Sequence, residues 1–127
     1  YEDGDANGNT PHDIVLEFET ADWTQDYDRM RELSCPQYHP TIYARESNSQ
    51  AGDWTPDMDM SNITTEVLDY YPPSGIAIVV HGVAEIYDED SQFINTYDYD
   101  AQSQLIGAYL KIVNGEWLVC TPESVTR

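Results

Sequence analysis

The sequence predicts an α+β domain in which N-terminal helices pack on a curved antiparallel β-sheet. Three observations indicate this class. Apolar residues recur at helical spacing between residues 11 and 33. From Ile63 onward they alternate every second residue, which is typical of strands. The pair Asn114-Gly115 separates two such segments, and this dipeptide favours a type I′ hairpin.

The first helix is expected from Pro11 to about Ala21. Thr10 is a favourable N-cap residue, Pro11 suits the first helical position, and Asp13 places a negative charge in the first turn. The apolar face consists of Ile14, Val15, Phe18 and Ala21.

A second helix is expected to begin near residues 22–24 and to end at Cys35-Pro36, because a residue before proline disfavours the helical conformation. One stripe of this helix carries Trp23, Tyr27, Met30 and Leu33. A short third helix or turn is predicted at residues 41–46. The polar segment 47–61 is predicted to be a loop.

Strands are expected to fill the remainder of the chain. The segment 76–87 has the clearest alternation, with Ile76, Ile78, Val80, Gly82, Ala84 and Ile86 on one face. The other predicted strands are 63–71, 105–113 and 116–120, with 88–92 as a turn and 93–100 as a weaker strand or an excursion.

The composition describes one domain, residues 10–127, after an acidic, glycine-rich segment 1–9 that is predicted to be a disordered leader or linker. The 24 acidic and 5 basic residues give a net charge of −19. This field repels phosphate backbones and anionic lipids, so it excludes nucleic acid and electrostatic membrane attachment. No apolar stretch approaches the ~18 residues of a membrane span. Because the chain begins with Tyr1, we expect a mature or trimmed fragment, compatible with an export signal or anchor before it.

The two cysteines, Cys35 and Cys120, are 85 positions apart. This spacing excludes a CxxC redox motif and a zinc site made of cysteine alone. A disulfide is the economical interpretation, and two unrelated buried thiols are the alternative. A disulfide predicts an extracytoplasmic location, either secreted or anchored at the cell envelope.

Three segments resemble the nuclear transport factor 2-like superfamily, the cystatin-like cone fold. These are the segment 26–35, which ends in Cys35, the strand 76–84, and the hairpin 109–120 with its lysine, glycine turn, tryptophan and cysteine. Within the superfamily the chain is similar to small secreted or membrane-anchored envelope domains of actinobacteria. The resemblance implies a curved sheet around a helix-lined cavity, with Cys35 bridged to Cys120. It does not imply a function, because this fold hosts many functions.

Five residues are candidates for lining a pocket or an interface. His81 lies on the strand face of Val79 and Val83, where it becomes a general base or polar anchor if that face lines the cavity. The amphipathic rings of Tyr70, Tyr97 and Tyr99 suit a cavity wall or a protein interface. Trp23 is the fifth candidate, from the helical stripe. The alternative is that His81 is a satisfied, half-buried side chain and that the tyrosines cover the sheet with their hydroxyls in water.

No catalytic residue, metal ligand or cofactor is assigned from the sequence. The acidic groups at 57–59, 88–90 and 98–100 do not match a calcium loop, and solvation of turns is the favoured interpretation. The sequence contains no nucleophile-elbow motif, no glycine-rich phosphate-binding loop and no HExxH motif.

These observations predict a non-catalytic envelope domain that binds a protein partner or a small apolar ligand, with dimerisation through the sheet as one form of partner. The alternative is a small cofactor-free isomerase, cyclase or dehydratase with His81, Asp69 or Glu85 directed into the cavity. A cavity filled by Phe18, Trp23 and Trp117 would argue against that enzyme. A third hypothesis is a spacer or oligomerisation module of a longer envelope protein.

Overall fold

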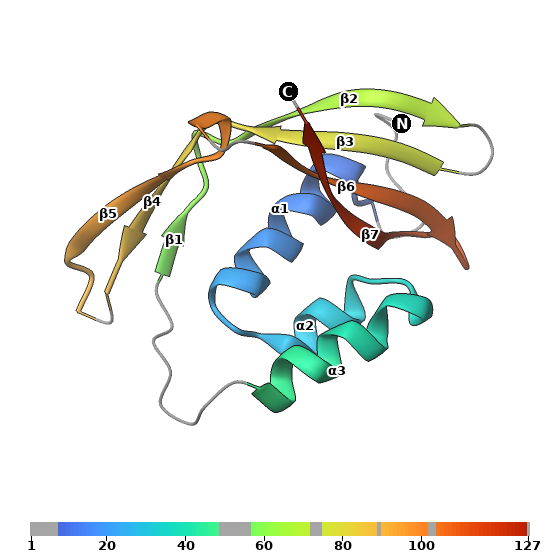
Figure 1. Ribbon diagram of the computed structural model, residues 1–127, viewed down its shortest axis with the longest axis horizontal. Helices are drawn as coiled ribbons and strands as arrows, with labels where there is room; N and C mark the ends of the chain where they lie inside the picture. Colours follow the sequence, from blue (N-terminus) through green and yellow to red (C-terminus); the bar gives the residue numbers. More distant parts are fainter. Residues whose placement is uncertain (1–7, 49–56, 72–74, 89, 102–103, 127) are drawn as a thin grey trace.

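The computed structural model describes residues 8–48, 57–71, 75–88, 90–101 and 104–126. Helices come first and strands after, so the predicted α+β class is confirmed. The predicted leader falls mostly outside the described residues. In Figure 1, α1 lies against the sheets, and α2 and α3 lie on its other side. The strands form two antiparallel sheets, one with the order β2-β3-β6-β7 and one with the order β1-β4-β5.

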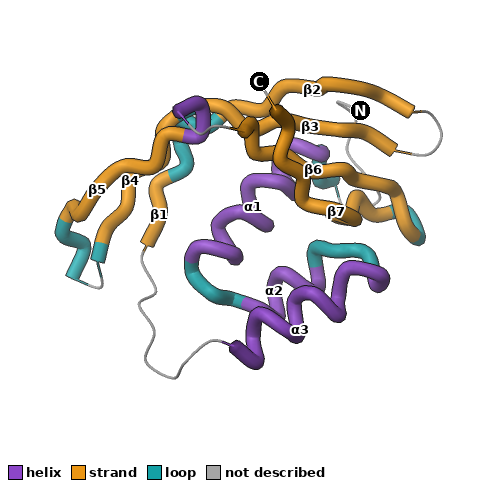
Figure 2. Tube along the Cα trace, in the orientation of Figure 1, coloured by secondary structure: helices purple, strands orange, loops and turns teal. Residues whose placement is uncertain are grey.

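The first helix, α1 (Pro11–Trp23), is confirmed and runs two residues past its predicted end. Thr10 and Asp13 form a capping box: the backbone N–H of Asp13 donates to Thr10 Oγ1 at 3.2 Å, and that of Thr10 donates to Asp13 Oδ2 at 3.1 Å. The helix stops because Gln25 adopts a left-handed φ of 58°, within the loop that joins α1 to α2 in Figure 2.

The second helix, α2 (Tyr27–Glu32), is shorter than predicted at both ends. Asp26 caps it by accepting a hydrogen bond from the backbone N–H of Arg29 at 3.2 Å. After Leu33, the backbone of Ser34 forms a parallel bridge with Val119 instead of another helical turn. The assignment of residues 22–24 to this helix was therefore wrong, since Asp22 and Trp23 belong to α1.

The third helix is longer than predicted. The 3₁₀ turn η1 (Pro36–Tyr38) leads into α3 (His39–Asn48), and the short strand β1 (Asp57–Asp59) lies within the segment predicted to be a loop. A three-residue strand is below the length at which alternation can be recognised in a sequence.

The larger sheet contains β2 (Thr64–Tyr71), β3 (Gly75–His81), β6 (Gln104–Val113) and β7 (Glu116–Thr126). These correspond to four predicted strands, and β7 continues six residues beyond its predicted end. Asn114 and Gly115 have φ values of 53° and 84°, as a type I′ turn requires, so the predicted hairpin between β6 and β7 is confirmed.

Gly82 divides the predicted strand 76–87 into β3 and β4 (Val83–Tyr87). Its φ is 109°, and a Cβ at this position would lie 2.5 Å from the carbonyl oxygen of Asn62, so only glycine fits without rearrangement. The bend transfers the chain from the larger sheet to the smaller one, where β4 pairs with β5 (Phe93–Asp98). The 3₁₀ turn η2 (Tyr99–Ala101) follows β5.

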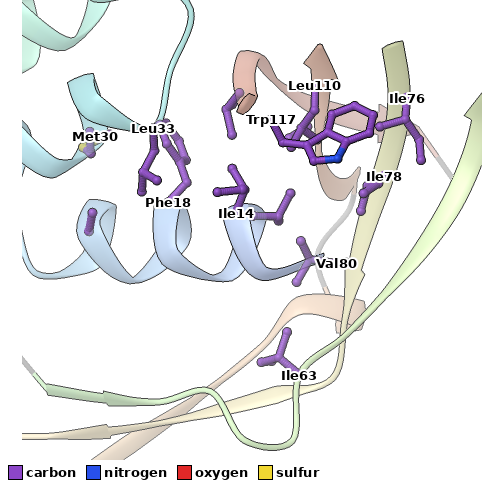
Figure 3. Packing of buried hydrophobic residues seen from close by; sticks show 14 of the residues in the cluster. Ile14, Phe18, Met30, Leu33, Ile63, Ile76, Ile78, Val80, Leu110 and Trp117 are labelled. Atoms are coloured by element: carbon purple, nitrogen blue, oxygen red, sulfur yellow. The ribbon is translucent and has the colours of Figure 1, made fainter. Parts of the chain in front are cut away.

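The core lies between α1 and the larger sheet. Figure 3 shows Ile14 of α1 directed toward Leu110 and Trp117 of the sheet, and Phe18 of the same helix beside Leu33 at the end of α2. Ile76, Ile78, Val80, Ala84 and Ile86, which share one face of the predicted long strand, are all buried, and Ala77 and Val79 of the opposite face are buried as well. The smaller sheet also lies against α1, where Trp23 contacts Tyr97 of β5.

The disulfide between Cys35 and Cys120 is present, and both residues are buried. Two backbone hydrogen bonds reinforce it: Cys35 N–H donates to the Val119 carbonyl, and Val119 N–H donates to the Leu33 carbonyl, each at 2.8 Å. The end of α2 is thereby fastened to β7.

Candidate functional site

The C-terminal half of α1 presents a polar face beside its apolar one. Glu19, Asp22 and Trp23 are spaced three and four residues apart, so they are neighbours on the helix surface. Trp23 reaches the smaller sheet, where the centroid of its ring lies 5.0 Å from that of Tyr97, in an edge-on arrangement. This face of α1 is therefore in contact with β5 and η2.

Tyr99 of η2 is fully buried at the centre of this contact. Its backbone N–H donates to the carbonyl of Gly82 at 2.9 Å, so the bend in the sheet fixes its position. The indole Nε1–H of Trp23 donates to the Tyr99 hydroxyl at 3.2 Å. The rings of Tyr97 and Tyr99 are 4.8 Å apart and edge-on, so the three aromatic residues form one cluster.

Glu19 completes the cluster, with its carboxylate accepting a hydrogen bond from the Tyr99 hydroxyl. Burial raises the pKa of Glu19 from 4.5 to about 7, and the negative charge of Asp22 adds to the increase. The hydrogen bond from Tyr99 and the positive charge of Arg45 act in the opposite direction without cancelling it. Glu19 consequently exchanges its proton near neutral pH.

The neighbouring tyrosines remain protonated over the range in which Glu19 titrates. Burial, and then the negative charge of Glu19, raises the pKa of Tyr99 and that of Tyr97 above the usual value of 10. Burial likewise raises the pKa of Tyr38, from η1. Glu19 is thus surrounded by neutral hydroxyl groups, of which Tyr99 is its direct donor.

A surface pocket of about 350 Å³ adjoins this cluster, and we call it the Trp23 pocket. Its lining residues are Asp22, Trp23, Gln25, Tyr27 and Arg45. Arg45 extends from α3 and forms a salt bridge with Asp22 across the pocket wall. Glu19 is not one of the lining residues. Its carboxyl group interacts electrostatically with two residues that are, Asp22 and Arg45. The volume lies within the range of small-molecule sites.

Two other pockets border α1 and α2. One of about 340 Å³ is lined by residues that include Trp117 and Glu32, and one of about 290 Å³ by residues that include Leu16 and Glu17. Both include Arg29, which is already paired with Glu17 and Glu32. Neither is lined by Trp23, Tyr97 or Tyr99, so the Trp23 pocket, which adjoins the aromatic cluster, is the stronger candidate.

The structure brings together three of the five residues singled out in the sequence, Trp23, Tyr97 and Tyr99. Tyr97 is partly buried and Tyr99 wholly buried, so Tyr99 is an internal residue and not part of an exposed interface. Tyr70 lies on β2 opposite Ile76 of β3, in the larger sheet, whereas Tyr97 belongs to the smaller one. The side chain of Tyr70 lies outside the described part of the chain.

His81 ends β3 on the face turned away from the helices, because Ile76, Ile78 and Val80 occupy the inward positions. Its Nδ1 lies 2.6 Å from Asp100 Oδ1, and its Nε2 lies 3.2 Å from Glu66 Oε1. The hydrogen bond to Asp100, followed by that to Glu66, raises the pKa of His81. The side chain is thus engaged in ion pairs on the outer face.

The acids named with His81 do not supply an inward base. Glu85 alternates with the buried Ala84 and Ile86, so it shares the outer face, where it accepts a hydrogen bond from the Tyr87 hydroxyl. Asp69 lies on β2, and its side chain is outside the described residues. Phe18 and Trp117 are buried, whereas Trp23 is partly exposed at the pocket wall.

Sequence reasoning missed Glu19 and Arg45. A pattern that could have revealed Glu19 is its position four residues after Val15, a buried member of the apolar face. An acidic residue next to the apolar face of a helix lies at the edge of the surface that the helix packs against. Arg45 has no comparable pattern, because its partner Asp22 is 23 positions away and α2 and η1 lie between them in the chain.

The acidic groups serve as local caps. Asp59 accepts from the backbone N–H of Ser61 at 2.9 Å, Asp88 accepts from that of Gln92 at 2.8 Å, and Asp98 accepts from that of Asp100 at 2.9 Å. Across the described part of the chain, no group of three or more His, Cys, Asp or Glu residues is arranged to hold a metal ion.

The chain has no match among protein-family models, curated proteins or solved structures. Within the described ranges, none of the helices combines the length and the apolar character of a membrane span.

Proposed function

We propose that this chain is a non-catalytic, extracytoplasmic domain that binds a small organic ligand in the Trp23 pocket. The observation that carries the proposal is the pocket of about 350 Å³ whose wall includes Trp23 and Tyr27 and which adjoins the half-buried Glu19 and the buried Tyr99. Aromatic walls supply apolar contact area, and a few polar groups fix the orientation of a ligand.

The proposed location rests on the disulfide. The buried bond between Cys35 and Cys120 supports an oxidising compartment, because disulfides persist outside the cytosol. The order of helices before an antiparallel sheet supports the proposed membership of the nuclear transport factor 2-like superfamily. With that membership goes the proposed cell-envelope setting, secreted or anchored, of the actinobacterial domains that the sequence resembles.

Native mass spectrometry of the chain, purified without denaturation from its own host, tests the proposal. We expect a reproducible added mass of a few hundred daltons that is lost on denaturation. The variant Trp23→Leu should lose this mass. The control Phe93→Leu should keep it, because Phe93 is exposed on β5 and forms an aromatic pair with Tyr87, outside the Trp23 pocket. A bare mass with a co-purified protein would instead indicate a protein partner, and retention of the ligand by Trp23→Leu would exclude this pocket.

A second candidate is a small cofactor-free enzyme, and one observation favours it. A carboxyl that titrates near pH 7 beside a protonated tyrosine is suited to general acid–base catalysis. The substrate would have to reach Glu19, which the lining of the Trp23 pocket does not include. Chemical conversion of the bound molecule by the wild type, and not by Glu19→Gln, would favour the enzyme over the carrier.

A further inference from the structure

We propose that the Trp23 pocket selects an organic monocation, that is, an ammonium group carried on a small apolar body. This inference rests on the proposed ligand-binding function and names the chemical class of its ligand.

The charges around the pocket are unequal. Two carboxyl groups, Glu19 and Asp22, face one guanidinium, Arg45. The other titratable groups that face Glu19 are the hydroxyls of Tyr38 from η1, Tyr97 from β5 and Tyr99 from η2, and all three are neutral at ordinary pH. When Glu19 is ionised, the cluster carries one negative charge in excess, which one proton or one bound cation can balance.

The walls favour an organic cation over a metal ion. Trp23 and Tyr27 line the pocket, and aromatic side chains attract ammonium groups, with the indole the strongest. A metal ion needs several oxygen ligands that converge on one point. In the described residues no such group exists, since Asp22 is bound to Arg45 and Glu19 to Tyr99.

An anionic ligand is disfavoured on two grounds. It would have to displace Asp22 from Arg45 to form an ion pair. It would also approach a chain of net charge −19. A cationic ligand is favoured, because the negative field of the chain attracts it toward the pocket. Its positive charge also stabilises the ionised carboxylate of Glu19.

Binding of the cation should therefore be linked to release of a proton from Glu19. A positive charge near the pocket stabilises the carboxylate, so the ligand and the proton compete. The competition is confined to the range around neutral pH where Glu19 titrates. A neutral ligand of the same shape would not show it.

The experiment compares choline with 3,3-dimethylbutan-1-ol, which has the same shape without the charge. The probe signal is the indole N–H resonance of Trp23, assigned with Trp23→Phe, and calorimetry in two buffers of different ionisation enthalpy counts protons released. We expect choline to bind about tenfold more tightly than the alcohol at pH 8, in line with a cation over an indole face next to a carboxylate. We also expect the affinity for choline to fall as the pH decreases from 8 to 5.

Matched variants separate the site from the general acidity of the chain. Asp22→Asn should weaken choline binding severalfold, whereas Asp28→Asn should not, although Asp28 also forms a salt bridge to an arginine. Glu19→Gln should abolish proton release and the pH dependence, whereas Glu17→Gln, on an exposed residue paired with Arg29, should preserve both. These four substitutions keep the size of the side chain, so loss of folding does not obscure the result.

Equal affinities for choline and the alcohol would overturn the cation proposal and leave the ligand-binding function in place, with an apolar ligand. Absence of binding by both probes at millimolar concentration would also overturn it, and the native mass measurement would then decide the function independently. Equal losses with Asp22→Asn and Asp28→Asn would show that choline responds to overall charge and not to this pocket, which is a third contrary result.

Discussion

The indole of Trp23 donates a 3.2 Å hydrogen bond to the hydroxyl of Tyr99, which lies 76 positions later in the chain. The bond joins the end of α1 to the turn that follows β5. It also completes a chain of donors, in which Trp23 donates to Tyr99 and Tyr99 donates to Glu19. The polar cluster is thus built where the smaller sheet meets the first helix.

Replacing Glu19 by Gln should stabilise the protein at high pH. Because folding raises the pKa of Glu19 from 4.5 to about 7, the folded state holds the proton more tightly than the unfolded state. The resulting stabilisation is complete below pH ~4.5 and is lost as the pH rises toward ~7. The loss is on the order of 3 kcal/mol in the free energy of unfolding.

Urea unfolding at pH 5 and pH 8 measures this effect. Glu19→Gln should match or trail the wild type at pH 5 and exceed it at pH 8, since the amide carries no charge to bury. Glu17→Gln is the control, because Glu17 lies two residues before Glu19 in α1 and its side chain is exposed. A parallel pH dependence in wild type and Glu19→Gln would contradict the assignment.

Tyr99→Phe should destabilise the protein by about 1–3 kcal/mol, because it leaves the indole N–H of Trp23 without its acceptor and Glu19 without its donor. It should also raise the pKa of Glu19 further, since the hydrogen bond from Tyr99 lowers that pKa. Tyr87→Phe removes a hydroxyl that bonds Glu85 at the surface and serves as the control. Equal melting temperatures for the two variants would show that the Tyr99 hydroxyl has no structural role.

Reduction of the disulfide should lower the melting temperature clearly. In the chain-entropy model, closing a loop of this length stabilises the folded state by ~4–5 kcal/mol, and measured values are commonly smaller. Melts with and without reductant test this, with thiol titration of the unfolded protein as the check that no free thiol exists beforehand. The double variant Cys35→Ala with Cys120→Ala should melt like the reduced wild type and be insensitive to reductant.

His81 should make stability depend on pH through its ion pairs on the outer face. Hydrogen bonds to Asp100 and then Glu66 raise the pKa of His81 above 6.5. The contribution of the charged imidazolium is therefore complete below about pH 6.5 and is lost as the pH rises through the folded-state value. The melting temperature of His81→Gln relative to wild type should be lower at pH 5.5 and should converge at pH 9. An NMR titration of the His81 ring that returned a lowered pKa would contradict the expectation.

Gly82→Ala should be strongly destabilising. The added methyl group would clash with the carbonyl oxygen of Asn62. The φ of 109° is also unfavourable for any residue with a side chain, and this backbone strain alone costs roughly 1–3 kcal/mol. Gly8→Ala is a matched control, because Gly8 also has a positive φ, 81°, but open space around it. If the two variants unfold at the same urea concentration, the close approach at Gly82 is unimportant.

Local patterns in the sequence sufficed for most of the elements. Thr10 and Pro11 mark the start of α1, and the alternation from Ile76 to Ile86 indicates extended strand, because both patterns depend on residues that are close in the chain. The Asn114-Gly115 turn is equally local, since both residues adopt the positive φ values for which this pair is suited. The pairing of Cys35 with Cys120 followed because these are the only cysteines.

The tertiary structure alone decided where the sheet bends and which side chains meet. The glycine at position 82 fits an alternating pattern, and only its approach to Asn62 shows that it divides the strand. The pKa of Glu19 depends on burial by segments distant in sequence and on Asp22 and Arg45, so no local pattern encodes it. Helical and strand periods report on neighbours in the chain. The candidate site is made by contacts among α1, α3, β5 and η2, and those contacts exist only after the fold has closed.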